Sequence, residues 1–142
     1  MVILLDYFNL PDNIFEIIFS TPQQSIVARV LLNYMKSKGN ELTKTEMSVI
    51  ATQLHEGKFV AELDQGEYKG RIVKLSYNKR QFYDRIVTPM KSMGLIDYDL
   101  YQKKYKISKK FTDVLRNLGL MWQKEVDTPL ENKMPSFKKI AV

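Results

Sequence analysis

The sequence predicts a mainly α-helical fold with a small β component, which is an α+β class. Two observations support this class. Segments with apolar residues at spacings of three and four follow residues suited to helix N-caps, and they predict four main helices. Short segments that alternate apolar and polar residues lie before and after the third of these helices, and they predict strands. The chain has 142 residues, which is enough for one core-bearing domain with extensions.

Residues 1–19 form an N-terminal arm with three acids and no base. Residues 2–8 are apolar, and they are compatible with a strand or with the start of a helix. Pro11 and Asp12 then open a short helical segment from Asn13 to Phe19. Because the arm is too apolar for a free tail, we expect it to pack on the body or on a second copy of the chain.

The first main helix begins at Thr21, an N-cap followed by a proline at the first helical position. Its apolar stripe has helical spacing, and Gly39 closes the helix. The stripe consists of Ile26, Val27, Val30, Leu31 and Tyr34.

The second main helix has the clearest local signal in the chain. Thr43 and Glu46 form a capping box, and Leu42 with Met47 is a hydrophobic staple. Leu42 or its neighbours could also form a very short strand. The expected buried face consists of Met47, Ile50, Ala51 and Leu54.

About twenty residues, 56–75, separate the second main helix from the third. Residues 58–63 and 71–75 alternate like strands, and the loop between them contains Gly66 and Gly70. We therefore expect an inserted β-hairpin; the alternative is a continuation of the second main helix.

The third main helix, residues 78–93, is the element around which the chain is organised. Asn78 is its N-cap with Gln81 as partner, Gly94 ends it in a left-handed conformation, and Pro89 should kink it or loosen its last turn. One face is expected to be buried and consists of Phe82, Ile86, Met90 and Met93. The opposite face is expected to carry Arg80, Asp84, Val87, Thr88 and Lys91.

A two-stranded ribbon follows the third main helix. Residues 95–99 and 104–107 alternate like strands, with a tip at residues 101–103. Ser108 then caps a fourth main helix, which either ends near Gly119 or continues through Trp122. Its apolar face consists of Phe111, Val114, Leu115 and Leu118. Residues 127–142 have no periodicity and are expected to be a tail.

The formal charge of +6 is concentrated in one part of the chain. Residues 76–94 sum to +3 and residues 95–110 sum to +3 again, so the third main helix, the ribbon and the start of the fourth helix account for the excess. A basic element in a near-neutral scaffold is typical of nucleic-acid binders, although a solvated basic surface gives the same count.

The fragment from Met90 to Ile96, MKSMGLI, is similar to the segment in which the recognition helix of winged helix-turn-helix proteins runs into the wing. The segment from Phe19 to Val27 also resembles the start of their first helix. The resemblance extends over residues 20–118 and implies a winged helix-turn-helix domain over residues 20–126, with the insertion at 56–75. Two departures from the pattern are this insertion and Asp84, an acid on the face that would meet DNA.

The resemblance implies that residues 78–93 lie in the major groove of duplex DNA and that residues 95–107 act as a wing. Arg80 is then the best candidate for contacting a guanine, with Asn78, Gln81 and Tyr83 as weaker candidates. The remaining candidate residues would contact the phosphate backbone or the adjacent minor groove. These are Lys79, Arg85, Lys91, Lys103, Lys104 and Lys106.

Several classes of function find no support in the sequence. The chain has no cysteine and one histidine, His55, which we interpret as a helix C-terminal dipole partner. Its acids are scattered, with no pair at a spacing that suggests general acid–base catalysis, and it has no glycine-rich phosphate loop. We therefore expect no catalysis, cofactor or metal. No apolar run is long enough to span a bilayer and no signal peptide is evident, so a cytoplasmic protein is expected.

Two functions remain. The first is a DNA-binding transcriptional regulator that forms a homodimer through the arm and the fourth main helix. The second is a winged-helix module that binds another protein, with residues 58–75 as the contact region. A plasmid or virus replication protein is intermediate between these two.

Overall fold

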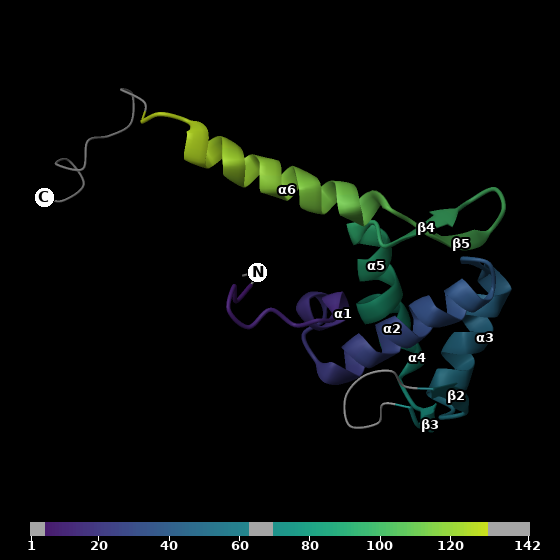
Figure 1. The fold of residues 1–142 in the computed structure, drawn as a ribbon. Helices are drawn as coiled ribbons and strands as arrows, with labels where there is room; N and C mark the ends of the chain where they lie inside the picture. Colours follow the sequence, from purple (N-terminus) through teal and green to yellow (C-terminus); the bar gives the residue numbers. More distant parts are fainter. Residues whose placement is uncertain (1–4, 63–69, 131–142) are drawn as a thin grey trace, which may run out of the picture.

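The computed structural model describes residues 5–62 and 70–130, and it has the α+β class that the sequence predicts (Figure 1). The helices are α1 (Ile14–Ile18), α2 (Pro22–Ser37), α3 (Lys44–His55), α4 (Lys79–Gln81), η2 (Phe82–Val87), α5 (Thr88–Met93) and α6 (Lys110–Asp127). The strands are β1 (Glu41–Thr43), β2 (Phe59–Glu62), β3 (Ile72–Leu75), β4 (Ile96–Asp99) and β5 (Lys104–Ile107).

Three short strands form an antiparallel sheet in the order β1-β5-β4. The predicted ribbon is present as β4 and β5, with Tyr98 opposite Tyr105. The sequence also suggested a short strand around Leu42, and this strand, β1, pairs with β5 so that Leu42 lies opposite Tyr105. The sheet therefore ties the start of α3 to the ribbon across more than sixty residues of sequence.

The segment between α3 and α4 forms a second, separate ribbon, and this confirms the predicted hairpin rather than a longer helix. Strands β2 and β3 pair antiparallel, with Phe59 opposite Leu75. Phe59 is buried against the ring of Tyr34 from α2, with the ring centroids 5.9 Å apart. The loop that carries Gly66 lies outside the described residues.

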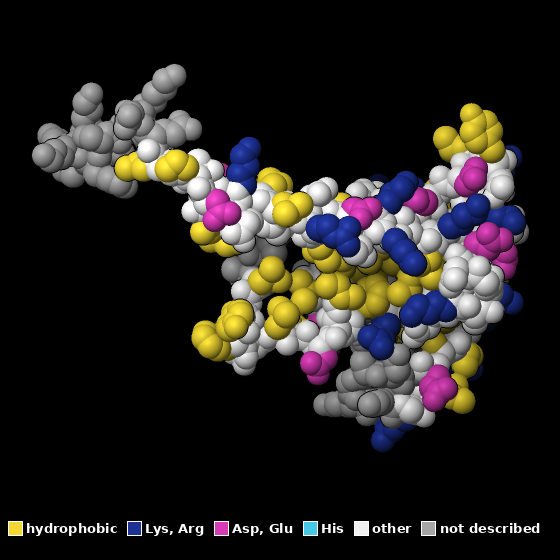
Figure 2. Space-filling model, turned by 45° about the horizontal axis from the view of Figure 1, so that its top comes forward, with side chains coloured by type: hydrophobic (Ala, Val, Ile, Leu, Met, Phe, Trp, Pro, Cys, Tyr) yellow, Lys and Arg dark blue, Asp and Glu magenta, His cyan; other side chains and the backbone are white. Residues whose placement is uncertain are grey.

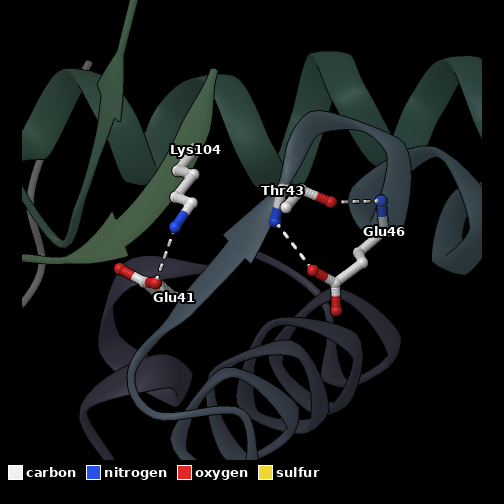
Figure 3. Close-up of polar contacts among 4 residues, drawn as sticks. All are labelled: Glu41, Thr43, Glu46 and Lys104. Carbon is white, nitrogen blue, oxygen red and sulfur yellow. Dashed lines mark hydrogen bonds and ion pairs between the residues drawn. The ribbon is translucent and has the colours of Figure 1, made fainter. Parts of the chain in front are cut away.

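Local capping signals predict the starts of α2 and α3 correctly. Thr21 Oγ1 accepts the backbone N–H of Gln24, and the capping box of Thr43 and Glu46 is complete (Figure 3). Leu42 and Met47, the predicted staple, are both fully buried. These contacts fix where each helix begins.

The core lies where α1, α2, α3, the α4–η2–α5 segment and the three-stranded sheet meet. Its fully buried large side chains come from distant parts of the sequence and include Leu31, Met47, Phe82, Met90 and Ile96. All four residues of the predicted buried face of α3 are in this core. Burial of apolar side chains on this scale is the main force that holds the fold together.

Helices α4, η2 and α5 follow one another without interruption from Lys79 to Met93, and we call this segment the central helix. Asn78 caps its start through a bond from Gln81 N–H, and Gly94 ends it with φ +82°. Both ends therefore agree with the sequence prediction.

The middle of the central helix differs from the prediction. Pro89 was expected to kink the helix or to loosen its last turn, and the irregular part is the preceding π-helical turn, where Thr88 N–H donates to Tyr83 C=O. Pro89 has no N–H to donate to the fourth residue back, and a wider turn relieves the clash of its ring with that carbonyl. The extra residue in the turn rotates Val87 toward the core. Val87 is therefore buried, and its predicted place on the outward face was wrong.

At both chain ends the structure selects among the predicted alternatives. Helix α1 packs on the body through Phe15 and Phe19, but Leu5, Tyr7, Phe8 and Leu10 stay exposed. The body therefore does not cover the first part of the arm. Helix α6 continues past Gly119 to Asp127 and projects away from the body (Figure 1).

Candidate nucleic-acid interface

The central helix presents one continuous polar side to solvent. The exposed residues recur every three or four positions, opposite the buried Phe82, Ile86 and Met90. This outward row consists of Arg80, Gln81, Asp84, Arg85, Thr88, Lys91 and Ser92. Its charged side chains are three bases and one acid, so the row has a net positive charge. The opposite side of the same helix is buried in the core.

Arg80 and Arg85 are the two arginines of the outward row. The Arg80 side chain is 91% exposed and its Nε lies 3.7 Å from Asp84 Oδ2, an i,i+4 pair at the surface. Exposed pairs of this kind are weak and are readily exchanged for another anion. Asp84 therefore orients Arg80 rather than removing its charge. Within the described residues, the Arg85 side chain has no hydrogen-bond or ion-pair partner.

Lys79 fastens the start of the central helix to the end of α3. Its backbone N–H donates to His55 Nδ1 at 3.1 Å, and its Nζ donates to Thr52 Oγ1 at 3.2 Å. The sequence suggested that His55 interacts with the dipole of its own helix, α3. In the structure, His55 Nδ1 accepts a hydrogen bond at the N-terminus of the central helix. These bonds tie the N-terminus of the central helix to the C-terminal turn of α3.

Tyr83, a candidate DNA contact in the sequence, points toward α3 instead of joining the outward row. Its ring packs edge-on against Phe82 with centroids 5.6 Å apart. Burial raises the pKa of the Tyr83 hydroxyl, and a hydrogen bond with the Ser48 side chain opposes this effect. We assign Tyr83 to the packing of the central helix on α3.

Lys91 connects the central helix to the ribbon. Its Nζ lies 6.0 Å from the ring centroids of Tyr98 and Tyr105, which stack on each other at 4.6 Å. This distance is the outer limit of a cation–π interaction. The lysine remains exposed at the edge of the stack, so its ammonium group lies at the junction of helix and ribbon.

The lysines of β5 lie among acids, which the sequence did not reveal. Lys104 Nζ forms an ion pair with Glu41 of β1 at 3.1 Å (Figure 3). Lys106 is opposite Asp97 on one side and Glu41 on the other. The outer side of this sheet is therefore nearly charge-balanced, although the segment containing it has an excess of lysine.

The tip of the ribbon connects β4 to β5. Asp99 Oδ1 accepts the N–H groups of Tyr101 and Gln102 at 2.9 and 3.0 Å, and the bond from Gln102 contributes most to lowering the pKa of this carboxyl. Lys103, with φ +53°, completes the turn and stays exposed. Leu100 and Tyr101 at this tip are 79% and 99% exposed, which no sequence pattern indicated.

Comparison with protein-family models, curated proteins and solved structures found no match to this chain. Among residues 5–62 and 70–130, no helix combines the length and the apolar character needed to cross a bilayer. In the same residues, no group of three or more His, Asp or Glu side chains is placed to hold a metal ion. The function must therefore be argued from the geometry alone.

Proposed function

We propose that this protein is a DNA-binding transcriptional regulator with a winged helix-turn-helix domain. In this proposal, α3 and the central helix form the helix-turn-helix, and the β4–β5 ribbon is the wing. The observation that carries the proposal is the central helix: one side is fully buried in the core, and the other is a basic outward row that ends beside the ribbon.

An α-helix fits the major groove of B-DNA, where base edges present distinct patterns of donors and acceptors. Residues near the N-terminus of such a helix reach the bases. Arg80 lies in the first turn, and its guanidinium can donate two bonds to a guanine. Arg85, Lys91 and Lys103 then contact phosphates.

The support for the lysines of the β4–β5 ribbon differs from one residue to the next. Lys103 is exposed at the tip of the wing, whereas Lys104 must give up its ion pair with Glu41 before it can bind a phosphate. Lys103 is therefore the stronger candidate for a backbone contact. We propose that Tyr101, which is exposed beside it, contacts sugar or base edges in the adjacent minor groove.

Selection of bound duplexes from a random pool tests this proposal. We expect the wild-type chain to enrich a defined sequence, and Arg80→Ala to lose preference at one guanine by about 5- to 150-fold, equivalent to about 1–3 kcal/mol. Arg116→Ala, an exposed arginine on α6, is the control and should leave the preference unchanged. A pool that shows no enrichment with the wild-type chain contradicts the proposal.

A second candidate function is a winged-helix module that binds another protein, and the β2–β3 ribbon favours it. Val60 and Ile72 are 56% and 74% exposed, and the strand register places both on the outer side of that ribbon. If this function holds, Val60→Asp combined with Ile72→Asp should abolish partner binding and leave DNA affinity unchanged.

A further inference from the structure

Helix α6 has an apolar side that nothing in the described structure covers. Six apolar residues follow the a, d and e positions of a heptad repeat, yet no residue of α6 is buried. The six are Phe111, Val114, Leu115, Leu118, Met121 and Trp122. Apart from the partly buried Phe111, their exposure ranges from 43% for Val114 to 70% for Trp122.

The N-terminal arm adds to the same exposed surface. Its four large apolar side chains, Leu5, Tyr7, Phe8 and Leu10, are exposed by 55% to 89%. The arm lies on the same side of α6 as the body (Figure 1), and Figure 2 shows hydrophobic side chains gathered on the face between α6 and the arm. An apolar patch of this extent marks an interaction surface.

We propose that a second copy of this chain covers this surface, with the two α6 helices packed antiparallel about a twofold axis near Leu118. We call the six apolar residues of α6 together with the four of the arm the α6–arm surface. This inference concerns the free protein and does not depend on DNA binding.

The position of Leu118 favours a twofold arrangement. It is the ninth of the eighteen residues from Lys110 to Asp127, so an antiparallel pair centred there brings the whole apolar stripe of each helix into contact. A twofold interface uses the same patch on both partners, so that patch must complement itself.

The distribution of charge along α6 favours the antiparallel arrangement, and Lys110 and Arg116 also form ion pairs within their own chain, with Asp97 and Asp113. Residues 109–118 contain three bases and one acid, whereas residues 119–127 contain two acids and one base. Antiparallel packing places the basic half of each helix beside the acidic half of the other. Parallel packing would place like charges together, which disfavours it.

The available area is sufficient for a stable dimer. Excluding the partly buried Phe111, nine large apolar side chains of the α6–arm surface are exposed, each offering on the order of 100 Å². Their sum, about 900 Å², is similar to the about 800 Å² per partner that a standard interface buries.

The start of α6 is held firmly, so the dimer would fix the two central helices relative to each other. Phe111 N–H donates to Gly94 C=O at 3.0 Å, and Ser108 N–H donates to Leu95 C=O at 3.0 Å. Lys110 Nζ pairs with Asp97 at 3.1 Å.

Sedimentation equilibrium of the full chain, without DNA, tests the dimer. We expect a dimer for the wild type and an increase of about 100-fold or more in the dissociation constant for Leu118→Glu, because a charge would be buried at the centre of the interface. Leu120→Glu is the matched control: Leu120 lies on the opposite side of the same helix, is 60% exposed, and should leave the dissociation constant within about threefold of the wild type. A monomeric wild type, or equal effects of the two substitutions, would overturn the proposal.

Trp122, the one tryptophan of the chain, supplies an independent readout. Its emission should shift to longer wavelength on dilution of the wild type, and it should already be at that wavelength in Leu118→Glu at every concentration. An emission that is independent of concentration and of the substitution would contradict burial of Trp122 between two copies.

Disulfide trapping tests the direction of packing, because the chain has no native cysteine. Val114 and Trp122 lie four residues on either side of Leu118. A mixture of Val114→Cys and Trp122→Cys should therefore give the mixed disulfide in an antiparallel dimer. Val114→Cys alone should give little crosslinked product. Efficient self-crosslinking of Val114→Cys would instead indicate parallel helices and overturn the arrangement.

Discussion

Gly94 joins three parts of the molecule at one residue. It ends the central helix, precedes β4, and accepts the Phe111 N–H at the start of α6. Its φ of +82° is a conformation that residues with a side chain rarely adopt. A Cβ added at this position would lie 2.9 Å from Lys110 Cβ and 3.0 Å from the backbone nitrogen of Phe111.

Gly94→Ala should therefore lower the free energy of unfolding by about 2–4 kcal/mol, because strain in the backbone is combined with a clash against backbone that cannot easily move. Urea denaturation measures this loss. Gly39→Ala is the matched control, since Gly39 also has a positive φ of +76° but nothing lies within 4 Å of an added Cβ. The control should lose only about 1 kcal/mol. Equal losses at both glycines would show that the contact with α6 contributes nothing.

Ion pairs between single residues also decide which basic side chains are available to bind an anionic partner. Asp84 is four residues from Arg80, so the sequence could suggest that the two pair, and the structure places them 3.7 Å apart. Glu41 is sixty-three residues from Lys104, and no local pattern indicates that they meet at 3.1 Å. A count of charges along the sequence therefore overstates the free positive charge of the ribbon.

At the scale of elements, the capping box of α3 should contribute to stability in a way that depends on pH and can be measured. Glu46 accepts the backbone N–H of Thr43, and this bond, with the Thr43 side chain, lowers the pKa of the Glu46 carboxyl (Figure 3). A carboxyl with a lowered pKa in the folded state stabilises the fold at neutral pH. The stabilisation is lost as the pH falls through the pKa of the folded state.

Glu46→Gln separates this effect from that of the other carboxyls. The glutamine oxygen can still accept the Thr43 N–H but does not titrate. We expect the wild type to be the more stable at neutral pH, and the difference in urea midpoint to narrow as the pH is lowered from about 7 to about 3. A difference that is independent of pH would show that the ionised carboxylate does not contribute through this bond.

The predictions from sequence are most accurate where an element depends on neighbouring residues. The caps at Thr21, Thr43 and Asn78, the turn at Gly94 and the two hairpins all depend on local geometry, and all are present. The π-helical turn before Pro89 was not predictable, because a proline can be accommodated by a kink, a break or a wider turn. The surrounding core selects the wider turn, and Val87 is buried as a result.

At the scale of the whole molecule, the sequence predicted an apolar face on the last helix, but not whether the rest of the chain covers that face. Periodicity indicates that Val114, Leu115 and Leu118 share a face, and it cannot show that α6 projects away from the body that would cover it.

The candidate interface was likewise predicted in outline: Arg80 and Arg85 are exposed on the outward row, whereas Tyr83 packs on α3. Besides the outer side of the β2–β3 ribbon, the described residues expose two candidate surfaces for partners, the outward row and the α6–arm surface.

If both proposals hold, the two surfaces act together. An α6 dimer relates two central helices by a twofold axis, and such a dimer reads two half-sites of a palindromic sequence. The duplexes enriched from a random pool should then contain an inverted repeat, and Leu118→Glu should enrich single half-sites.

The central claim is that the outward row of the central helix binds DNA, and the salt dependence of binding tests it most directly. The dissociation constant for duplex DNA, measured at salt concentrations from about 50 to about 200 mM, should give a linear log–log plot whose slope reports the phosphates contacted. We predict that Arg85→Ala reduces the magnitude of the slope by about 0.9 and that Arg116→Ala leaves it unchanged. The absence of duplex binding at low salt, or equal slopes for Arg85→Ala and Arg116→Ala, would contradict the claim.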